Sequence, residues 1–242
     1  MNAVETQNLT KAYGVRTVVD RLNLAIGEGE LFALLGPNGA GKTTTIRMLS
    51  CLTVPTEGDA LVSGESIMKN PEAVRARINV SPQETAVAQK LSVRENLELI
   101  AEIYGMRRAK AAEMAETMIR DFALSDCARD RAKKLSGGMQ RRLSIAMALI
   151  SNPEVLFLDE PTLGLDVRAR RALWKHVEAL KKRMTIILTT HYLEEAEALS
   201  DRIGILNRGR LAALGTAAEI LSQTGEASFE DAFLALTDEE RV

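Results

Sequence analysis

One segment of the sequence has residue types and spacing suited to binding a chain of phosphates. It reads Gly36, Pro37, Asn38, Gly39, Ala40, Gly41, Lys42 and Thr43, which fits the pattern GxxxxGK[ST]. Glycines let such a loop curl, so that backbone N–H groups and the positive end of a following helix face phosphate oxygens. Lys42 supplies a mobile positive charge for the β- and γ-phosphates, and the Thr43 hydroxyl suits Mg²⁺. An apolar run at 31–35 precedes the loop and a helical pattern at 44–49 follows it, which favours a phosphate-binding loop over an ordinary glycine turn.

Two adjacent acids form the second candidate for chemistry. Asp159 and Glu160 follow the apolar run 155–158, and near the end of a strand both side chains can reach the same side. An acid pair alone also fits a helix N-cap or a surface turn. ATP hydrolysis, however, needs a metal ligand and a group that positions water. Beside a phosphate-binding loop we therefore expect Asp159 to hold the Mg²⁺ shell and Glu160 to polarise the attacking water.

The segment 135–140 has the features of a second anion-binding site. It reads Leu135, Ser136, Gly137, Gly138, Met139 and Gln140 and precedes a helical pattern. Ser136 offers a hydroxyl, and the two glycines leave backbone N–H groups bare at the start of the helix. The same residues also fit a plain helix cap, and the residues alone leave both interpretations open.

The hydrophobic pattern predicts the elements that position these residues. Apolar runs at 31–35, 155–158, 186–188 and 203–206 are typical of buried parallel strands, and helical patterns alternate with them, which predicts an α/β fold. Between about 91 and 135 there is no convincing strand, and Ser92 with Glu95 matches a helix capping box, so we expect a helical insertion. In the tail, Phe229, Phe233 and Leu236 share one helical face, which indicates core packing or, alternatively, partner docking.

Composition limits the class of protein. The 242 residues, 46% of them hydrophobic and 26% charged, suffice for one or two folded domains. There are 31 basic and 33 acidic residues, which gives a net charge of −2, so no nucleic-acid partner is expected. Cys51 and Cys127 form no disulfide or zinc motif, which fits a reducing cytosol. The start of the chain lacks signal-peptide features and no apolar run could span a bilayer, so we expect that this chain alone does not cross a membrane.

Taken together, the motifs resemble a known family. The segment 135–140 resembles the LSGGQ signature of ABC transporter ATPases, with Met139 placed before Gln140, and the resemblance covers Leu9 to about Ala218. It implies an α/β P-loop NTPase fold with a RecA-like, mostly parallel core sheet, an N-terminal antiparallel β subdomain and a helical insertion subdomain. It also implies a single ABC ATPase domain over 1–242, with the core at about 1–90 and 151–220, the helical subdomain at about 91–150 and a short helical tail at 221–242.

The resemblance adds four positions to the candidate site. Tyr13 resembles the aromatic residue that stacks on adenine, and Gln83 resembles the glutamine that joins the Mg²⁺ and water network and couples the site to the membrane subunit. Asp166 resembles the D-loop aspartate and is also a good helix N-cap, and His191 resembles the switch histidine at the γ-phosphate. An exposed strand tyrosine and a surface-loop glutamine are the alternatives for Tyr13 and Gln83. The other histidine, His176, is interpreted as structural or solvated.

The family pattern therefore assigns three groups of residues. Catalysis falls to Glu160, His191, Lys42 and Gln83, Mg²⁺ binding to Thr43, Gln83 and Asp159, and ATP binding to Tyr13, Gly36, Pro37, Asn38, Gly39, Ala40, Gly41, Lys42, Thr43, Thr44, Ser136, Gly137, Gly138 and Asp166. The implied function is an ATP-hydrolysing subunit that energises an ABC membrane transporter. ATP would lie between two such domains arranged head to tail, in a homodimer or with a paralogue. An integral membrane permease would hold the chain peripherally on the cytoplasmic face of the cell membrane.

Export is the favoured direction of transport. The segments 43–49 and 229–233 resemble those of drug-, sodium- and lipid-exporter ATPases. The stretch after His191 is too short for the additional regulatory domain that many importers carry, which also favours export. A soluble ABC ATPase acting in DNA repair or translation is the alternative. DNA-repair relatives carry long coiled coils where this chain has only 44–134, and translation relatives carry two ATPase domains where this chain has one phosphate loop and one signature. A simple P-loop kinase or GTPase leaves 135–140 unexplained, and the Asn-Lys-x-Asp guanine motif is missing.

Overall fold

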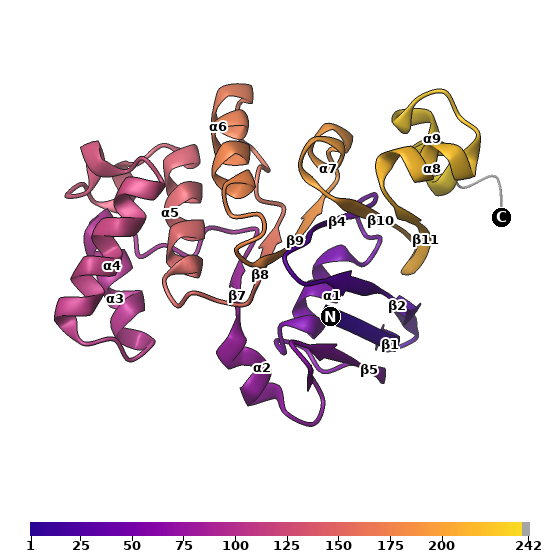
Figure 1. Ribbon diagram of the computed structural model, residues 1–242, viewed down its shortest axis with the longest axis horizontal. Coiled ribbons are helices and arrows are strands. Elements are labelled where there is room, and N and C mark those ends of the chain that lie inside the picture. The colour runs from indigo at the N-terminus through magenta and orange to yellow at the C-terminus, as the bar shows by residue number, and fades with distance from the viewer. Residues whose placement is uncertain (239–242) are drawn as a thin grey trace.

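The computed structural model describes residues 1–238 and has an α/β architecture built around two sheets. The larger sheet has the order β11-β10-β4-β9-β8-β7 and occupies the centre of the molecule (Figure 1). Its strands are β4 (Leu31–Leu35), β7 (Ile78–Ser81), β8 (Val155–Asp159), β9 (Thr185–Thr190), β10 (Arg202–Asn207) and β11 (Arg210–Gly215). Neighbouring strands are parallel except for β10 and β11. The predicted, mostly parallel core sheet is therefore confirmed.

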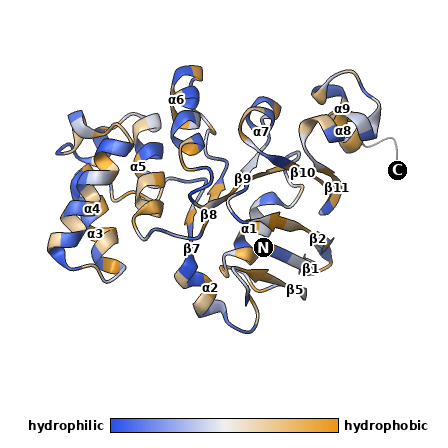
Figure 2. Cartoon of the chain, in the orientation of Figure 1, coloured by the Kyte–Doolittle hydropathy of each residue, from blue (hydrophilic) through white to orange (hydrophobic). Residues whose placement is uncertain are grey.

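Burial explains why the central strands read as unbroken apolar runs. Every residue of β4, β8 and β9 is buried, because a parallel sheet is covered on both of its faces. Figure 2 shows hydrophobic residues gathered along these strands, whereas the helix α6 (Val167–Glu178) is mostly hydrophilic. The sheet thus forms a rigid base from which the polar residues at the strand ends project.

The smaller sheet is antiparallel and uses the N-terminal part of the chain, as the family resemblance implied. Its strands are β1 (Asn2–Tyr13), β2 (Arg16–Leu22), β3 (Ala25–Gly27), β5 (Glu57–Val62) and β6 (Glu65–Ser66), in the order β2-β1-β5-β6 with β3 also paired to β1. Helix α1 (Lys42–Leu49) contacts both sheets, because its Ile46 and Leu49 belong to one buried cluster with Leu9 of β1 and Phe157 of β8. The helix that begins with Lys42 is therefore fixed by apolar packing.

Helices fill most of the chain between β7 and β8. After α2 (Pro71–Arg77) and β7 come α3 (Val93–Ile103), α4 (Arg108–Asp121) and α5 (Gly137–Leu149), with short 3₁₀ turns at Ser125–Cys127 and Ala132–Lys134. The Ser92 hydroxyl accepts a hydrogen bond from the Glu95 N–H at 3.2 Å, and the Glu95 carboxylate accepts one from the Ser92 N–H at 2.7 Å. These two bonds are the predicted capping box. The helical insertion expected from the sequence is therefore present.

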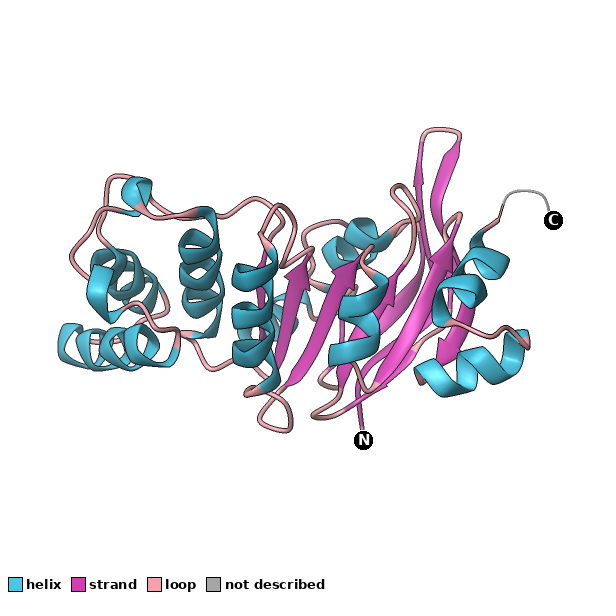
Figure 3. Ribbon diagram, turned by 90° about the horizontal axis from the view of Figure 1, so that it is seen from above, coloured by secondary structure: helices cyan, strands magenta, loops and turns pink. Residues whose placement is uncertain are grey.

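The last helices lie at the opposite end of the main sheet from α3, α4 and α5 (Figure 3). They are α8 (Ala217–Thr224) and α9 (Phe229–Thr237), preceded along the chain by α7 (Leu193–Leu199) after β9. Phe229 is buried, and Phe233 and Leu236 pack against the same core cluster, so this face of the tail serves core packing. Residues 239–242, the end of the predicted tail, lie outside the described residues. Among the described helices, none combines the length and apolar character that a bilayer span requires.

A buried acid connects α6 to α7. Glu195 of α7 is fully buried, and its carboxylate accepts a hydrogen bond from the indole N–H of Trp174 in α6 at 2.9 Å. Burial raises the pKa of Glu195 above its ordinary value of 4.5, and the charge of Glu160 acts in the same direction, while hydrogen bonds oppose the rise. The folded protein therefore holds this proton more strongly than the unfolded chain does.

Replacing Glu195 with Gln is expected to stabilise the protein increasingly as the pH rises. The unfolded chain releases this proton near pH 4.5, whereas the folded chain keeps it to higher pH because the pKa of the buried carboxyl is raised. The stability that depends on the bound proton is therefore present below pH 4.5 and is lost as the pH rises through the folded pKa. Melting temperatures of wild type and Glu195→Gln, measured from about pH 5 to pH 8, should diverge.

The exposed Glu197, in the same helix, supplies the control. The Glu197→Gln variant should track the wild type across the same pH range, since the Glu197 side chain already faces solvent. A melting-temperature gain of Glu195→Gln that shrinks with rising pH would mean that the fold holds Glu195 as a carboxylate.

Candidate active site

The phosphate-binding loop runs from the end of β4 to the start of α1, and two of its glycines are required by close backbone approaches. A Cβ at Gly36 would lie 2.4 Å from the carbonyl oxygen of Leu206. Gly41 has a φ of +104°, and a Cβ there would lie 2.6 Å from the carbonyl oxygen of Val18. Because Gly41 is the N-cap of α1 and has no side chain to cap it, the first N–H groups of the helix remain available to an anion.

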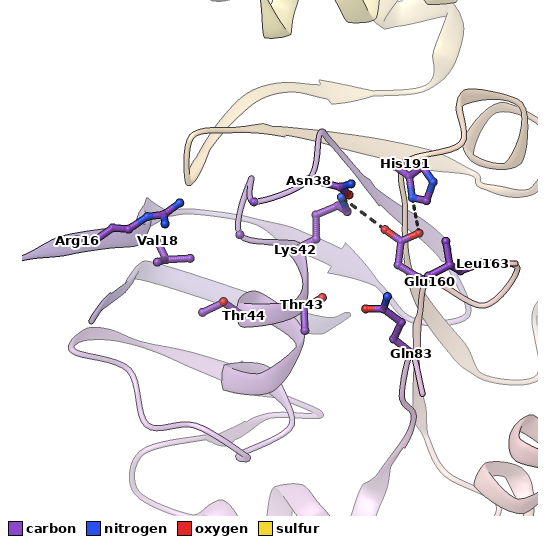
Figure 4. A pocket seen from close by; sticks show the side chains of 12 residues that line it. Arg16, Val18, Asn38, Lys42, Thr43, Thr44, Gln83, Glu160, Leu163 and His191 are labelled. Carbon is purple, nitrogen blue, oxygen red and sulfur yellow. Dashed lines mark hydrogen bonds and ion pairs between the residues drawn. The ribbon is translucent and has the colours of Figure 1, made fainter. Parts of the chain in front are cut away.

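Lys42 brings a buried positive charge to this loop. Its side chain is only 6% exposed, and its ammonium group donates hydrogen bonds to the carbonyl oxygens of Gly36 at 2.6 Å and Pro37 at 3.1 Å. The same nitrogen lies 3.5 Å from Oε1 of Glu160 (Figure 4). Burial lowers the pKa of Lys42, and the charge of Glu160 opposes this. A bound polyanion would favour the charged form further, so the site is electrostatically prepared for phosphate.

Asp159, the last residue of β8, joins the loop to the neighbouring strand. Its Oδ1 accepts hydrogen bonds from the hydroxyls of Thr43 at 3.1 Å and Thr189 at 2.5 Å. Thr189 lies opposite Asp159 in the pairing of β8 with β9, which explains the contact. Thr43 and Asp159 together present a hydroxyl and a carboxylate, the hard oxygen donors that Mg²⁺ prefers, so the residues present fit this ion.

Glu160 and His191 form a pair at the same edge of the sheet. Glu160 has a φ of +48°, and its backbone N–H donates to Thr189, to the carbonyl at 3.1 Å and to the hydroxyl at 3.0 Å. This left-handed turn directly after β8 lets Asp159 and Glu160, which would alternate in a strand, both face the site. Oε2 of Glu160 lies 2.7 Å from Nδ1 of His191 (Figure 4). The carboxylate is thus held between the lysine and the histidine.

Lys42, Thr43, Glu160 and His191 line a pocket of about 460 Å³, whereas Asp159 lies behind Thr43, to which it is hydrogen-bonded. The pocket is lined by Arg16, Val18, Asn38, Gly39, Gly41, Lys42, Thr43, Thr44, Gln83, Glu160, Leu163 and His191. The amide of Gln83 points toward Thr43 from the opposite wall (Figure 4). Among the predicted loop residues, Gly36, Pro37 and Ala40 do not line this pocket. The volume is in the range of small-molecule sites, and the mostly polar lining, with charges of both signs, suits a charged ligand.

Three predicted regions lie outside this pocket. Tyr13 ends β1, is 50% exposed, and has the Lys11 ammonium 5.1 Å from its ring centre. The hydroxyl of Ser136 accepts a hydrogen bond from the N–H of Met139 at 3.3 Å, so it caps α5. Asp166 likewise caps α6. None of these residues lines the pocket, although Tyr13 lies opposite the pocket residue Arg16 in the pairing of β1 with β2.

The structure also adds residues that the motifs did not predict. These are Arg16, Val18 and Leu163 in the pocket wall, Thr189 beside Asp159, and the buried Arg141 behind the site. A threonine at the end of an apolar run was the only available signal for Thr189. Arg141 has the same residue type as its neighbour Arg142, so the sequence does not distinguish the two. The helix residue His176 stacks on Phe122 with ring centres 5.2 Å apart, in agreement with its structural interpretation.

Comparison with known proteins agrees with this geometry. Residues 19–163 match the family model described as "ABC transporter". The chain is 46% identical over 225 residues to the daunorubicin/doxorubicin resistance ATP-binding protein DrrA of Streptomyces peucetius, covering 92% of this chain and 68% of that protein. It is 42% identical over 221 residues to the Nod factor export ATP-binding protein I of Paraburkholderia xenovorans, covering 91% of this chain and 73% of that protein.

Solved structures show the same fold. The ATP-binding subunit of an ABC transporter superposes with a TM-score of 0.85 at 30% identity, covering 97% of this chain and 99% of that chain. A dimeric ATP-binding cassette in a post-hydrolysis state, bound to ADP and Pi, superposes with a TM-score of 0.80 at 27% identity. The match covers 88% of this chain and 98% of that chain. From its motifs, its pocket and these relatives, the chain belongs to the ABC transporter family, as an ATP-binding subunit whose ATP hydrolysis is coupled to transport.

Proposed function

We propose that the pocket beside the phosphate-binding loop holds the phosphates of ATP and that Glu160 activates the attacking water. The contact of one carboxylate with both Lys42 and His191, at 3.5 Å and 2.7 Å, carries this proposal. Lys42 binds the β- and γ-phosphates. His191 orients Glu160 and contacts the γ-phosphate, so that the carboxylate can accept a proton from water. Backbone N–H groups within residues 38–44 surround the remaining phosphate oxygens.

Mg²⁺ belongs to the same proposal. Thr43, Asp159 and Gln83 are the residues that would hold it, supported by the hydrogen bond between Thr43 and Asp159 and by the direction of the Gln83 amide. When bound, Mg²⁺ supplies charge neutralisation at the β- and γ-phosphate oxygens. Thr189 fixes the orientation of Asp159 through its 2.5 Å hydrogen bond. At the outer end of the site, the half-exposed ring of Tyr13 stacks on adenine.

The signature residues act, in this proposal, on the nucleotide of a second domain. Ser136 and Gly137 are exposed, lie outside their own chain's pocket, and begin a helix whose N-terminus favours anions. A head-to-tail dimer brings Ser136, Gly137 and Gly138 of one domain, with its Asp166, to the ATP of the other. The dimeric cassette among the similar solved structures supports this arrangement. The second domain is another copy of this chain or a paralogue.

The partner that crosses the membrane is an integral permease, and the transport is export. Two relatives described above are named for drug resistance and for Nod factor export, which supports this direction. The permease contacts the chain near Gln83 and holds it on the cytoplasmic face of the cell membrane. Residues 1–242 act as one ABC ATPase domain, with the core at about 1–90 and 151–220, the helical subdomain at about 91–150 and the tail at 221–242.

The Glu160→Gln variant is expected to bind ATP with an affinity within about threefold of the wild type and to hydrolyse it at least about 100-fold more slowly, because the amide cannot accept the proton. Equilibrium binding of a fluorescent ATP analogue and the steady-state release of phosphate measure the two effects. The Glu154→Gln variant, at the opposite end of β8 and exposed, is the matched control and should keep full activity. Hydrolysis by Glu160→Gln near the wild-type rate would contradict the role of Glu160.

The Asp159→Asn variant is expected to raise the Mg²⁺ concentration for half-maximal hydrolysis by at least about 10- to 100-fold, since it removes a charged ligand. Its binding of ATP in the presence of EDTA should stay near that of the wild type. Thr189→Val, which removes the hydroxyl that donates to Asp159 and accepts from the Glu160 N–H but leaves the Asp159 carboxylate in place, should produce a smaller increase. An unchanged Mg²⁺ requirement in Asp159→Asn would place the ion elsewhere.

A further inference from the structure

One buried side chain without a role in the proposed mechanism contacts several parts of the site. Arg141 lies in α5, five positions after Ser136, and is only 4% exposed. Its Nε donates to the carbonyl oxygen of Pro161 at 2.9 Å, and its Nη2 donates to that of Asp159 at 2.8 Å. Its Nη1 donates to the carbonyl oxygens of Pro82 and, at 3.3 Å, of Gln83. One guanidinium therefore binds the backbone on both sides of the site.

The chemistry of these contacts requires a planar fork of donors. Each hydrogen bond of Arg141 goes to a backbone carbonyl of the segments 82–83 or 159–161. Burial lowers the pKa of Arg141 to about 10, and the charge of Asp159 opposes this, so the side chain is charged at neutral pH. Burying a cation costs free energy, and here the hydrogen bonds to four carbonyl groups offset that cost. A lysine has a single nitrogen and cannot span the same carbonyls.

The next residue, Arg142, makes purely structural contacts and serves as a comparison for Arg141. Arg142 donates to the carbonyl oxygens of Phe122 at 2.9 Å and Ala123 at 3.1 Å, just beyond the end of α4. Those carbonyls lie in the helical layer and not in the pocket wall. Arg142 thus ties α5 to α4, whereas Arg141 ties α5 to the two segments that carry Gln83 and Glu160.

We propose that Arg141 is a positioning residue for ATP hydrolysis, which holds Gln83 and Glu160 at a fixed separation across the pocket. Because α5 begins with the signature residues, Arg141 also connects the helix that serves the partner's nucleotide to the catalytic acid of its own chain. If α5 moves when the dimer closes, Arg141 would transmit that movement to the backbone around Glu160. The proposal rests on the function proposed above and adds to it a residue that links the two sites.

The Arg141→Lys and Arg142→Lys variants test this role directly. Arg141→Lys should lower kcat by about 10- to 100-fold, as small displacements of catalytic groups do, while KM for ATP stays within about threefold. Arg142→Lys should lower the melting temperature and keep kcat within about twofold. If Arg141→Lys does not fold, Arg141→Gln, which replaces the buried charge with a neutral amide, serves for the same comparison.

A double-mutant cycle distinguishes positioning from general loss of structure. If Arg141 acts through Gln83, the Arg141→Lys substitution should lower kcat much less in a Gln83→Ala background than in the wild type. A kcat of Arg141→Lys within twofold of the wild type, or a loss that multiplies fully with that of Gln83→Ala, would overturn the proposal. A wild-type chain without ATPase activity would contradict the proposed function instead, so the two failures are distinguishable.

Discussion

The parallel pairing of β4, β9 and β8 is the constraint on which the rest of the structure depends. Leu35 lies opposite Thr190, and Asp159 lies opposite Thr189, so the three strands end together at one edge of the sheet. The phosphate loop leaves β4 there, the acid pair leaves β8, and His191 leaves β9. Ligands bind outside the carboxyl ends of parallel strands for this geometric reason. The buried apolar strands make the arrangement rigid. The polar residues of the site therefore lie at the end of each strand or within one or two positions after it.

The buried charges at this edge of the sheet serve the site and not the stability of the fold. Four charged side chains are buried here, namely Lys42, Asp159, Glu160 and Arg141, and removing each of them from water costs free energy that their mutual contacts must offset. Glu160 in addition occupies a left-handed backbone conformation that is strained for a residue with a side chain. Charges and strain of this kind persist where they are needed to prepare a site for a highly charged ligand. The structure therefore matches a site whose charges are arranged for a nucleotide.

The sequence predicted the parts of the site that are contiguous in the chain. The phosphate loop and the acid pair could be identified because each needs a short run of residues next to a strand. Thr189 and Arg141 could not, because their roles depend on strand register and on the packing of α5 against β7 and β8. The roles of Tyr13, Ser136 and Asp166 remain predictions from the family pattern, since none of the three lines the pocket. Asp166 also illustrates how one residue fits two roles, because its N-cap bond is present in the structure.

The central claim is that each chain holds one half of an ATP site and that a second domain completes it. Sedimentation velocity of the Glu160→Gln chain, with and without ATP and Mg²⁺, tests this most directly when the same chain carrying Ser136→Glu is run beside it. The account predicts an ATP-dependent dimer that the Ser136→Glu substitution abolishes while ATP binding to the monomer is retained. A chain that stays monomeric when saturated with ATP, or a dimer that is indifferent to Ser136→Glu, would contradict it.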